Sequence, residues 1–327
     1  MRQVELGRGG PKIGAVGLGC MSFGGMYGPT DMATSHATLK RALDLGVSHL
    51  DIADIYGGGV CEEVVGAFLK ANGNPFTIAT KAGIITGPQR GVNNSRDYLT
   101  ACLDGSLKRL GVERVDLFYI HRRDPAVPVE EVMETLTGFI AAGKIAAIGF
   151  SEIAPWTLER AARIHPVAAV QSEYSLWTRQ PELGMLDLCR RLGTTFVSFS
   201  PVARGMLTDA EPDPSAFAPG DFRSANPRFQ EPHLSANLEK IRRFRAYAAQ
   251  RGVAASTLAI AWTFARAPGS LAIPGTRSAT HLDENAAAAS LHLSEADLAE
   301  IEAILPAGFA HGPRYSAAQA AAVEDYC

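Results

Sequence analysis

The chain is poor in cysteine and has no paired cysteine motif. Its 327 residues include five cysteines, at positions 20, 61, 102, 189 and 327, and none of them belongs to a CxxC pair. An odd and scattered set of this kind argues against a disulfide framework and against a zinc knuckle. We therefore expect reduced thiols, a cytoplasmic protein and no bound metal.

The sequence also lacks long apolar runs and an excess of either charge. No apolar stretch approaches the ~20 residues of a transmembrane helix, and residues 1–7 have no apolar segment of the signal-peptide kind. The formal net charge is only -3. A nucleic acid or an anionic membrane would favour a basic surface. We therefore expect no nucleic-acid partner and no membrane partner.

What the chain does contain is a regular alternation of strand-like and helix-like segments. The apolar patterns predict strands at residues 16–19, 48–51, 76–81, 115–121, 145–150, 168–171, 195–199 and 270–274. They predict helices at residues 32–45, 61–70, 95–110, 129–142, 155–164 and 180–192, and one beginning near residue 278. Eight strands in this alternation favour a closed (β/α)8 TIM barrel over an open sheet. We expect one domain over residues 1–327.

One segment interrupts the alternation. Residues 208–231 contain several prolines and little periodicity, so we expect a long loop after the seventh strand. Loops of that length in a compact domain are usually lids or binding loops. The segment from Gly312 onward follows the terminal helix as a C-terminal extension, and we expect it to reach the same open face.

Polar residues stand at the ends of three successive predicted strands. The strand at 48–51 ends on Asp51, with Tyr56 in the glycine-rich loop beyond it, and the next two strands end on Lys81 and His121. Consecutive strand ends of a parallel barrel meet on one face, where barrel enzymes place their chemistry. A lysine cation near a phenol stabilises the phenolate and lowers its pKa from about 10. The four residues therefore predict a proton-transfer site, although any one of them alone would suit a surface or structural role.

The sequence holds one candidate phosphate site. The glycine-rich residues 17–24 lack GxGxxG spacing and do not lead into a phosphate-binding helix, so we exclude them as a dinucleotide fingerprint. Residues 272–278 instead form a strand, a turn and the start of a helix, with Arg277 in the turn. Barrel enzymes often bind phosphate there with the help of a helix N-terminus. A helix cap at Ser278 and a salt bridge of Arg277 remain the simpler alternative.

Several motifs, in order along nearly the whole chain, resemble the aldo-keto reductase superfamily. They are Asp51-Ile-Ala-Asp-Ile-Tyr56-Gly, Ala79-Thr-Lys81, His121 with Asp124-Pro125, Gly143-Lys-Ile, Ile148-Gly-Phe-Ser151-Glu, Gln171-Ser-Glu-Tyr174-Ser-Leu-Trp177, residues 199–205, and Ile273-Pro-Gly-Thr-Arg277 leading to Glu284-Asn285. The Ser-Glu and Tyr-Ser-Leu-Trp variants are most similar to the bacterial and plant branch that contains pyridoxal reductases and perakine reductase.

The resemblance implies roles for many residues. The catalytic tetrad would be Asp51, Tyr56, Lys81 and His121, with Tyr56 as the general acid of carbonyl reduction. The predicted NADP(H)-binding residues are Gly19, Cys20, Met21, Asp51, Ser151, Gln171, Phe199, Ser200, Pro201, Val202, Arg204, Gly205, Gly275, Thr276, Arg277, His281, Glu284 and Asn285. Thr276 and Arg277 would contact the 2′-phosphate, which favours NADPH over NADH. The substrate pocket would draw on Met26, Tyr27 and Trp177.

Three positions depart from the common family pattern. Phe199 replaces a tyrosine that stacks on the nicotinamide, which preserves stacking but removes a hydroxyl. Glu152 replaces a common asparagine, and His281 stands where relatives often have arginine or glutamine.

The resemblance implies an NADPH-dependent reductase of a small aldehyde or ketone, either a monomer or a homo-oligomer. Two other functions remain open. Regulatory β subunits of potassium channels share the fold, and a barrel lyase or aldolase could use Lys81 as a Schiff-base amine.

Overall fold

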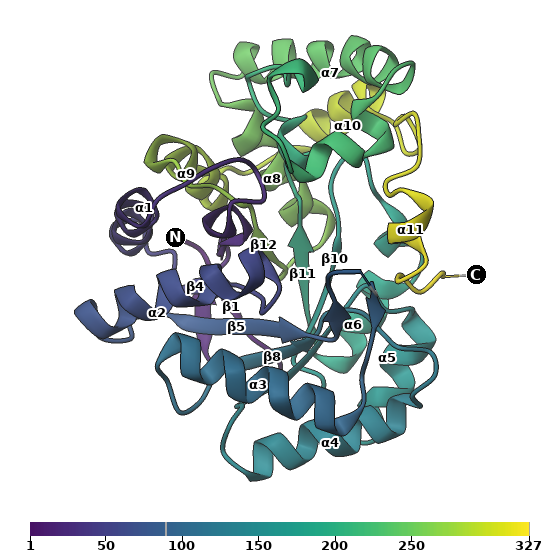
Figure 1. Cartoon of the computed structure of the whole chain (residues 1–327). Helices are drawn as coiled ribbons and strands as arrows, with labels where there is room; N and C mark the ends of the chain where they lie inside the picture. The colour runs from purple at the N-terminus through teal and green to yellow at the C-terminus, as the bar shows by residue number, and fades with distance from the viewer. Residues whose placement is uncertain (89, 327) are drawn as a thin grey trace.

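A closed barrel of parallel strands forms the centre of the molecule. The structure, a computed structural model, describes residues 1–88 and 90–326. In this part of the chain, eight parallel strands pair in sequence order: β3 (Leu18–Gly19), β4 (His49–Asp51), β5 (Thr77–Ala82), β8 (Leu117–Ile120), β9 (Ile148–Ser151), β10 (Ala169–Glu173), β11 (Thr195–Phe199) and β12 (Leu271–Ile273). Bridges from Val16 to Ala272 and from Gly19 to Gly275 join the two ends of the sheet. The predicted (β/α)8 TIM barrel is therefore confirmed (Figure 1).

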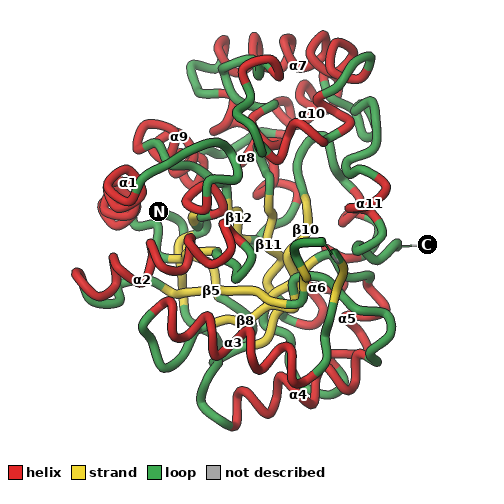
Figure 2. Tube along the Cα trace, in the orientation of Figure 1, coloured by secondary structure: helices red, strands yellow, loops and turns green. Residues whose placement is uncertain are grey.

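Helices surround the strands, as the tube in Figure 2 shows. They are α1 (Met32–Asp44), α2 (Val60–Asn72), α3 (Arg96–Leu110), α4 (Val129–Ala141), α5 (Pro155–Ala162), α6 (Met185–Leu192), α7 (His233–Gln250), α8 (Ala255–Arg266), α9 (Ala279–Ala287), α10 (Glu295–Ile304) and α11 (Ala317–Ala320). In α4, for example, Val129, Val132 and Leu136 are buried while the intervening glutamates lie outside. This spacing is that of a helix with one apolar face against a sheet.

Two apolar cores result from the alternation of side chains along the strands. In β8, Leu117 and Tyr119 belong to the cluster inside the barrel, whereas Phe118 and Ile120 belong to the larger cluster between strands and helices. Successive strand residues point to opposite faces of a sheet, which explains this division. Tyr119 is wholly buried among the lumen residues. The barrel interior is thus filled by side chains and is not a channel.

A short antiparallel hairpin, β1 (Gln3–Glu5) and β2 (Lys12–Gly14), covers the amino ends of the strands. The Gly7 amide donates to Oγ1 of Thr195, and that hydroxyl donates to the Glu5 carbonyl at 2.6 Å. Because Thr195 begins β11, these bonds place the hairpin at the end of the barrel opposite the predicted site. The sequence patterns did not predict this hairpin.

The structure corrects one predicted helix and adds two local details. Residues 180–192 do not form one helix: a 3-10 turn at Gln180–Glu182 is separated from α6 by Gly184, whose φ is 107°. Such a left-handed backbone interrupts an α-helix and suits glycine. Ser95 precedes α3, but its side chain makes no capping bond. The C-terminal extension contains the short helix α11.

The predicted long loop lies between β11 and α7 and is built from short turns. Three 3-10 turns, Pro214–Ala216, Phe222–Ala225 and Pro227–Phe229, each begin after an Asp or Asn side chain that accepts a backbone N–H. The Phe222 amide also donates to the Met26 carbonyl at 3.0 Å. The loop therefore contacts the first loop of the barrel. Within the described residues, no helix has the length and apolarity needed to cross a bilayer.

Candidate active site

Lys81 joins the predicted catalytic residues into one hydrogen-bonded group. Its Nζ donates to Oδ1 of Asp51 at 2.5 Å, to the Tyr56 hydroxyl at 3.2 Å and to the Ile52 carbonyl at 2.8 Å. The Lys81 side chain has no exposed surface. Burial disfavours its charge, but the Asp51 carboxylate and Tyr56 raise the pKa of Lys81 above its usual range. Lys81 is therefore a buried cation held between an acid and a phenol.

Gln171 supports Asp51 from across the barrel. Its Nε2 donates to Oδ2 of Asp51 at 2.6 Å, so both oxygens of this carboxylate have a donor. Asp51 ends β4 and Gln171 lies in β10. The sequence prediction gave Gln171 a contact with the cofactor and did not include the bond to Asp51. With the amide nitrogen used by Asp51, the Gln171 carbonyl oxygen remains available for a ligand.

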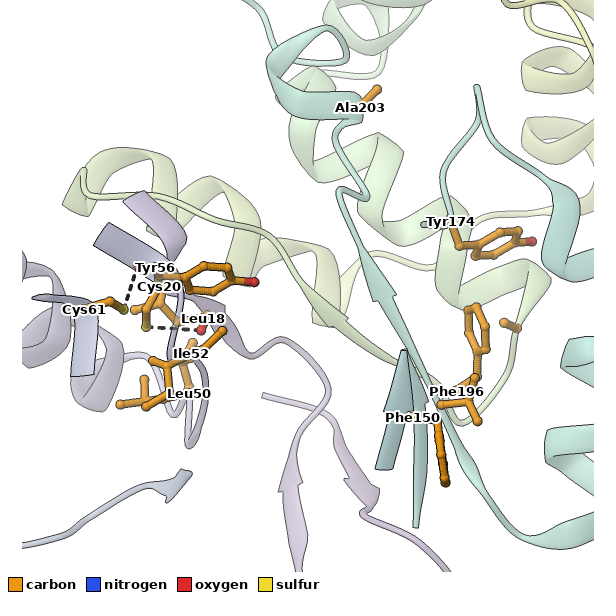
Figure 3. Packing of buried hydrophobic residues seen from close by; sticks show 14 of the residues in the cluster. Leu18, Cys20, Leu50, Ile52, Tyr56, Cys61, Phe150, Tyr174, Phe196 and Ala203 are labelled. Carbon is orange, nitrogen blue, oxygen red and sulfur yellow. Dashed lines mark hydrogen bonds between the residues drawn. The ribbon is translucent and has the colours of Figure 1, made fainter. Parts of the chain in front are cut away.

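The loop that carries Tyr56 is held closely by its surroundings. Tyr56–Gly59 forms a 3-10 turn in which Gly57 and Gly58 both have a φ of 64°. A Cβ at Gly24 would lie 2.6 Å from the Gly57 nitrogen, so only glycine allows these two segments to approach. Figure 3 shows Tyr56 beside Cys20, with its hydroxyl turned away from Cys61.

Burial determines the acidity of Tyr56. Desolvation raises the pKa of the phenol to about 12, although the Lys81 cation opposes this change. The lowered pKa expected from the sequence is therefore wrong for this structure, because the sequence revealed the lysine but not the burial. Tyr56 is a neutral O–H group at physiological pH, which is the form of a proton donor.

His121 is an uncharged ring beside Tyr56. The two ring centroids lie 5.9 Å apart in an edge-to-face arrangement. Burial first, then the nearby Arg122 and Lys81 cations, hold the pKa of His121 well below its usual range. Its Nδ1 is buried and has no hydrogen-bond partner within the described residues. His121 can therefore act as a neutral hydrogen-bonding group but not as a cation.

Arg122, which the sequence analysis did not select, connects several site residues. Its Nη1 donates to the His121 carbonyl at 2.6 Å and to Oγ of Ser151 at 3.1 Å, and its Nη2 lies 3.4 Å from the Tyr315 hydroxyl. The sequence feature that could have identified Arg122 is its position directly after His121 at a strand end. Ser151, predicted to bind the cofactor, is thus held by Arg122.

The predicted phosphate residues lie where β12 meets α9, close to the first strand. Gly19 and Gly275 form a backbone bridge, with Cys20 and Met21 directly following Gly19. Oγ1 of Thr276 accepts the Ser278 amide at 3.0 Å, and Ser278 caps α9 by accepting the His281 amide. Further along α9, Glu284 is partly buried and Asn285 is buried, whereas the His281 side chain is exposed. These predicted residues therefore gather around one helix N-terminus.

Arg277 extends from this turn over the first loop. Its Nη1 donates to the Gly28 carbonyl at 3.0 Å, and within the described residues no carboxylate lies at ion-pair distance from it. The predicted salt bridge of Arg277 is therefore not formed there, while the predicted cap at Ser278 is present. An arginine free of carboxylates next to a helix N-terminus fits a phosphate group.

The segment after β11 has the strained backbone of a binding loop. Ser200, Ala203, Arg204 and Gly205 all have positive φ, between 49° and 95°. Such conformations in residues other than glycine persist only where the surroundings enforce them. Successive amides in left-handed segments can form a concave site for an anion. The predicted cofactor residues Phe199, Ser200, Pro201, Val202, Arg204 and Gly205 lie in this segment, and their backbone fits a pyrophosphate.

The Arg204 side chain, in contrast, belongs to a buried ionic network. Its Nη2 donates to Oε2 of Glu173 at 2.9 Å, and the two side chains are 2% and 0% exposed. Arg314 from the C-terminal extension contacts Glu173 and forms an ion pair with Glu152. The extension thus reaches the carboxyl ends of β9 and β10, as expected. Glu173 and Arg314 were not selected as site residues, because their pairing spans 141 residues.

The three residues predicted for the substrate pocket have different surroundings. Met26 and Tyr27 lie in the first loop, where Arg223 from the long loop stands 5.4 Å from the Tyr27 ring centroid. Trp177 is buried beneath the same loop: its ring meets Phe229 edge to face and Arg228 at 4.9 Å. Its contact with a substrate stays a prediction.

Comparison with known proteins supports the same interpretation. A model of the aldo/keto reductase family matches residues 15–306. The chain is 38% identical over 315 residues to the aldo-keto reductase yakc [NADP(+)] of Schizosaccharomyces pombe, covering 94% of this chain and 93% of that protein. It is 37% identical over 324 residues to a probable aldo-keto reductase 1 of Glycine max, covering 96% and 92%.

Solved structures also resemble the barrel. A glycerol dehydrogenase from Gluconobacter oxydans superposes with a TM-score of 0.83 at 26% identity, over 93% of this chain and 94% of that chain. A thermostable aldo-keto reductase in complex with the inhibitor epalrestat superposes with a TM-score of 0.74 at 29% identity, over 93% and 100%.

Proposed function

Because the chain belongs to the aldo-keto reductase family, we propose that it reduces an aldehyde or ketone to the alcohol with NADPH as cofactor and Tyr56 as proton donor. The observation that carries this proposal is the contact of Lys81 Nζ with both Asp51 and the Tyr56 hydroxyl. An oxidoreductase needs a hydride donor and a proton donor for this reaction. The chain supplies the second of these from its own residues.

The phosphates of NADPH would lie on the carboxyl face of the barrel. The N-terminus of α9 and Arg277 would hold the 2′-phosphate, and the backbone amides of Ser200, Val202 and Arg204 would hold the pyrophosphate. Ser151 and the free carbonyl of Gln171 would bind the carboxamide. When bound, NADPH supplies a hydride to the carbonyl carbon of the substrate.

Tyr56 would donate its proton to the carbonyl oxygen as the alcohol forms. Burial keeps its pKa near 12, so the phenol is protonated when the substrate arrives. After transfer, the Lys81 cation 3.2 Å away stabilises the phenolate. Asp51, which accepts from Lys81 and Gln171, keeps that cation in place.

His121 would orient the substrate carbonyl. A ring that stays neutral carries its proton on one nitrogen, and the buried Nδ1 has no acceptor for a proton among residues 1–88 and 90–326. We assign that proton to Nε2, from which it can donate to the carbonyl oxygen. This bond polarises the carbonyl without adding a charge that would repel the Lys81 cation.

The test compares Tyr56→Phe with the wild type for turnover of NADPH with a panel of aldehydes. Loss of a general acid should lower kcat by about 10²–10⁴-fold, while fluorescence titration should show unchanged NADPH affinity. Tyr247→Phe is the matched control, because its hydroxyl donates to Asp297 between α7 and α10, away from the tetrad. Full turnover by Tyr56→Phe would contradict the assigned acid. NADPH binding without turnover of any carbonyl by the wild type would instead favour a regulatory subunit.

The pH dependence gives a second measurement of the same assignment. Since the pKa of His121 lies well below its usual range and that of Tyr56 lies near 12, kcat for reduction should be flat from about pH 6 to pH 9. Oxidation of the alcohol needs the phenolate, so its rate should rise with pH over the same interval. A decline in reduction centred near pH 6.5 would contradict the neutral state of His121.

A further inference from the structure

A cavity lies outside the group of proposed catalytic residues. It has a volume of about 430 Å³ and is bordered by the loop after β4, by β6 (Ile84–Ile85), and by α3. None of the four tetrad residues lines it. The cavity borders the loop that carries Tyr56. Asp54 in its lining lies two residues before Tyr56, and the Asp54 amide donates to the Lys81 carbonyl at 3.1 Å.

Asp54 brings an unsatisfied carboxylate to this cavity. Its Oδ1 is buried and has no hydrogen-bond partner within residues 1–88 and 90–326. A buried polar atom without a partner loses the hydrogen bonds that it made to water in the unfolded chain. The buried Asp51 has a donor on each oxygen, whereas the Asp54 carboxylate is short of donors and can accept one from outside the chain.

The other charges around the cavity leave that carboxylate uncompensated. Arg109 lines the cavity, but its guanidinium contacts Oε2 of Glu62 at 2.7 Å. Glu62 also accepts from Oγ1 of Thr80 at 2.6 Å, so its own oxygens are occupied. Arg109 and Glu62 cancel each other, and Asp54 gives the lining an excess of one negative charge. This balance favours a cation over an anion.

The remaining lining residues are apolar or neutral. Ile55, Ile84 and Ile85 contribute aliphatic walls. The Tyr98 hydroxyl donates to the Ile84 carbonyl at 3.1 Å and so is not directed to Asp54. Burial and the nearby Asp54 raise the pKa of the Cys102 thiol to about 11, so this group is neutral and weakly nucleophilic. The cavity thus combines one carboxylate with an aliphatic surface.

We propose that this cavity binds a small organic ammonium ion, whose N–H donates to the Asp54 carboxylate and whose apolar body lies on Ile55, Ile84 and Ile85. A metal ion suits the site less, because only one free carboxylate is present, and within the described residues no three His, Cys, Asp or Glu side chains are arranged to hold a metal. The proposal does not depend on the reductase activity.

The ionisation of Asp54 supports this choice. Burial and the neighbouring Glu62 raise the pKa of Asp54 to about 7, while Cys102 and Arg109 lower it. A bound ammonium would stabilise the charged form of the carboxylate. Affinity for an amine that stays protonated should therefore increase from pH 6 to pH 8, in the range where Asp54 loses its proton. Glu62 from α2, and Tyr98, Cys102 and Arg109 from α3, are the titratable groups that face Asp54 or the cavity.

The experiment measures binding of 2-phenylethylamine and of its neutral analogue 2-phenylethanol to the full chain by saturation-transfer NMR titration. Ligands of this size bind with Kd of roughly 0.1–10 mM, which the method covers. We expect the amine to bind about tenfold more tightly than the alcohol, as a charge-assisted hydrogen bond provides. In Asp54→Asn, the amine and the alcohol should bind with nearly equal affinity. Asp97→Asn, at an exposed position on α3, is the matched control and should retain the tenfold difference.

A steric variant locates the site independently of charge. Ala101 is an exposed lining residue on α3, so Ala101→Trp can fill the cavity without repacking the core and should remove the preference for the amine. The proposal is overturned if the amine binds no more tightly than the alcohol in the wild type. It is equally overturned if Asp54→Asn or Ala101→Trp binds the amine as the wild type does, or if no binding of the amine is detected.

Discussion

Glu173→Gln removes the central negative charge of the buried network beneath the C-terminal extension. In the wild type, Oε2 of Glu173 accepts from Arg204 at 2.9 Å and from Arg314 at 3.5 Å, and Oε1 accepts from Thr178 at 3.0 Å. The glutamine amide keeps the shape and part of the hydrogen bonding. It leaves Arg204, whose side chain is 2% exposed, without its carboxylate partner.

The expected cost follows from this uncompensated cation. Breaking a buried ion pair by changing one partner costs about 3–5 kcal/mol. At the unfolding entropy typical of a chain of 327 residues, each kcal/mol corresponds to roughly 1.5 °C in Tm. Glu173→Gln should therefore lower Tm by roughly 4–7 °C.

The assay is thermal unfolding followed by circular dichroism at pH 7, with equilibrium urea unfolding as a second measure. Glu130→Gln is the matched control, because Glu130 forms a two-bond ion pair with Arg160 on the surface, where the side chains are 45% and 52% exposed. Exposed pairs contribute about 0–1 kcal/mol. A double variant, Glu173→Gln with Arg204→Met, removes both charges and should recover part of the loss.

If Glu173→Gln lowers the free energy of unfolding by less than about 1 kcal/mol, this reasoning is refuted, because Arg204 must then reach water or another carboxylate without cost. Failure of the double variant to recover any stability would also count against it. In that case the hydrogen bonds of Glu173, and not its charge, would stabilise the network.

Two further predictions concern the surroundings of the site. Gly24→Ala should lower the free energy of unfolding by about 1–3 kcal/mol and should also lower kcat, because the new Cβ would lie 2.6 Å from the Tyr56 carbonyl carbon. Urea unfolding and activity assays measure the two effects. Gly138→Ala, at a helix position with open space, is the control and should be neutral or stabilising. Burial, with Lys81, lowers the pKa of His49 to about 3, below the ~6.5 of an unfolded chain. Protons thus favour the unfolded state, so the free energy of unfolding should fall as pH decreases from about 6.5 toward 3, by up to ~1.4 kcal/mol per pH unit. In His49→Leu, the free energy of unfolding from urea titrations should depend less steeply on pH between pH 4 and 7. An unchanged pH dependence would contradict the assignment.

Local sequence patterns were sufficient to predict the barrel and the position of the proposed catalytic residues. Short apolar strands end on Asp51, Lys81 and His121, and in a parallel barrel the ends of neighbouring strands necessarily meet. The same logic located the turn at Arg277 before α9. In each of these cases the information lies within a few consecutive residues.

Features that depend on distant pairing or on burial could not be predicted in this way. The bond between Gln171 and Asp51 joins residues 120 positions apart, and the Arg314 pair with Glu173 joins residues 141 positions apart. The direction of the Tyr56 pKa was missed because desolvation depends on the folded surroundings. The break at Gly184 was missed because the apolar pattern continues across it.

The bond from Gln171 to Asp51 also bears on how the enzyme becomes active during folding. β4 and β10 lie four places apart in the eight-stranded order, on opposite sides of the ring. Asp51 therefore obtains its second donor only after both halves of the chain have formed their strands and the ring has closed. During refolding, enzymatic activity should report closure of the barrel, whereas helical circular dichroism reports the separate formation of its parts.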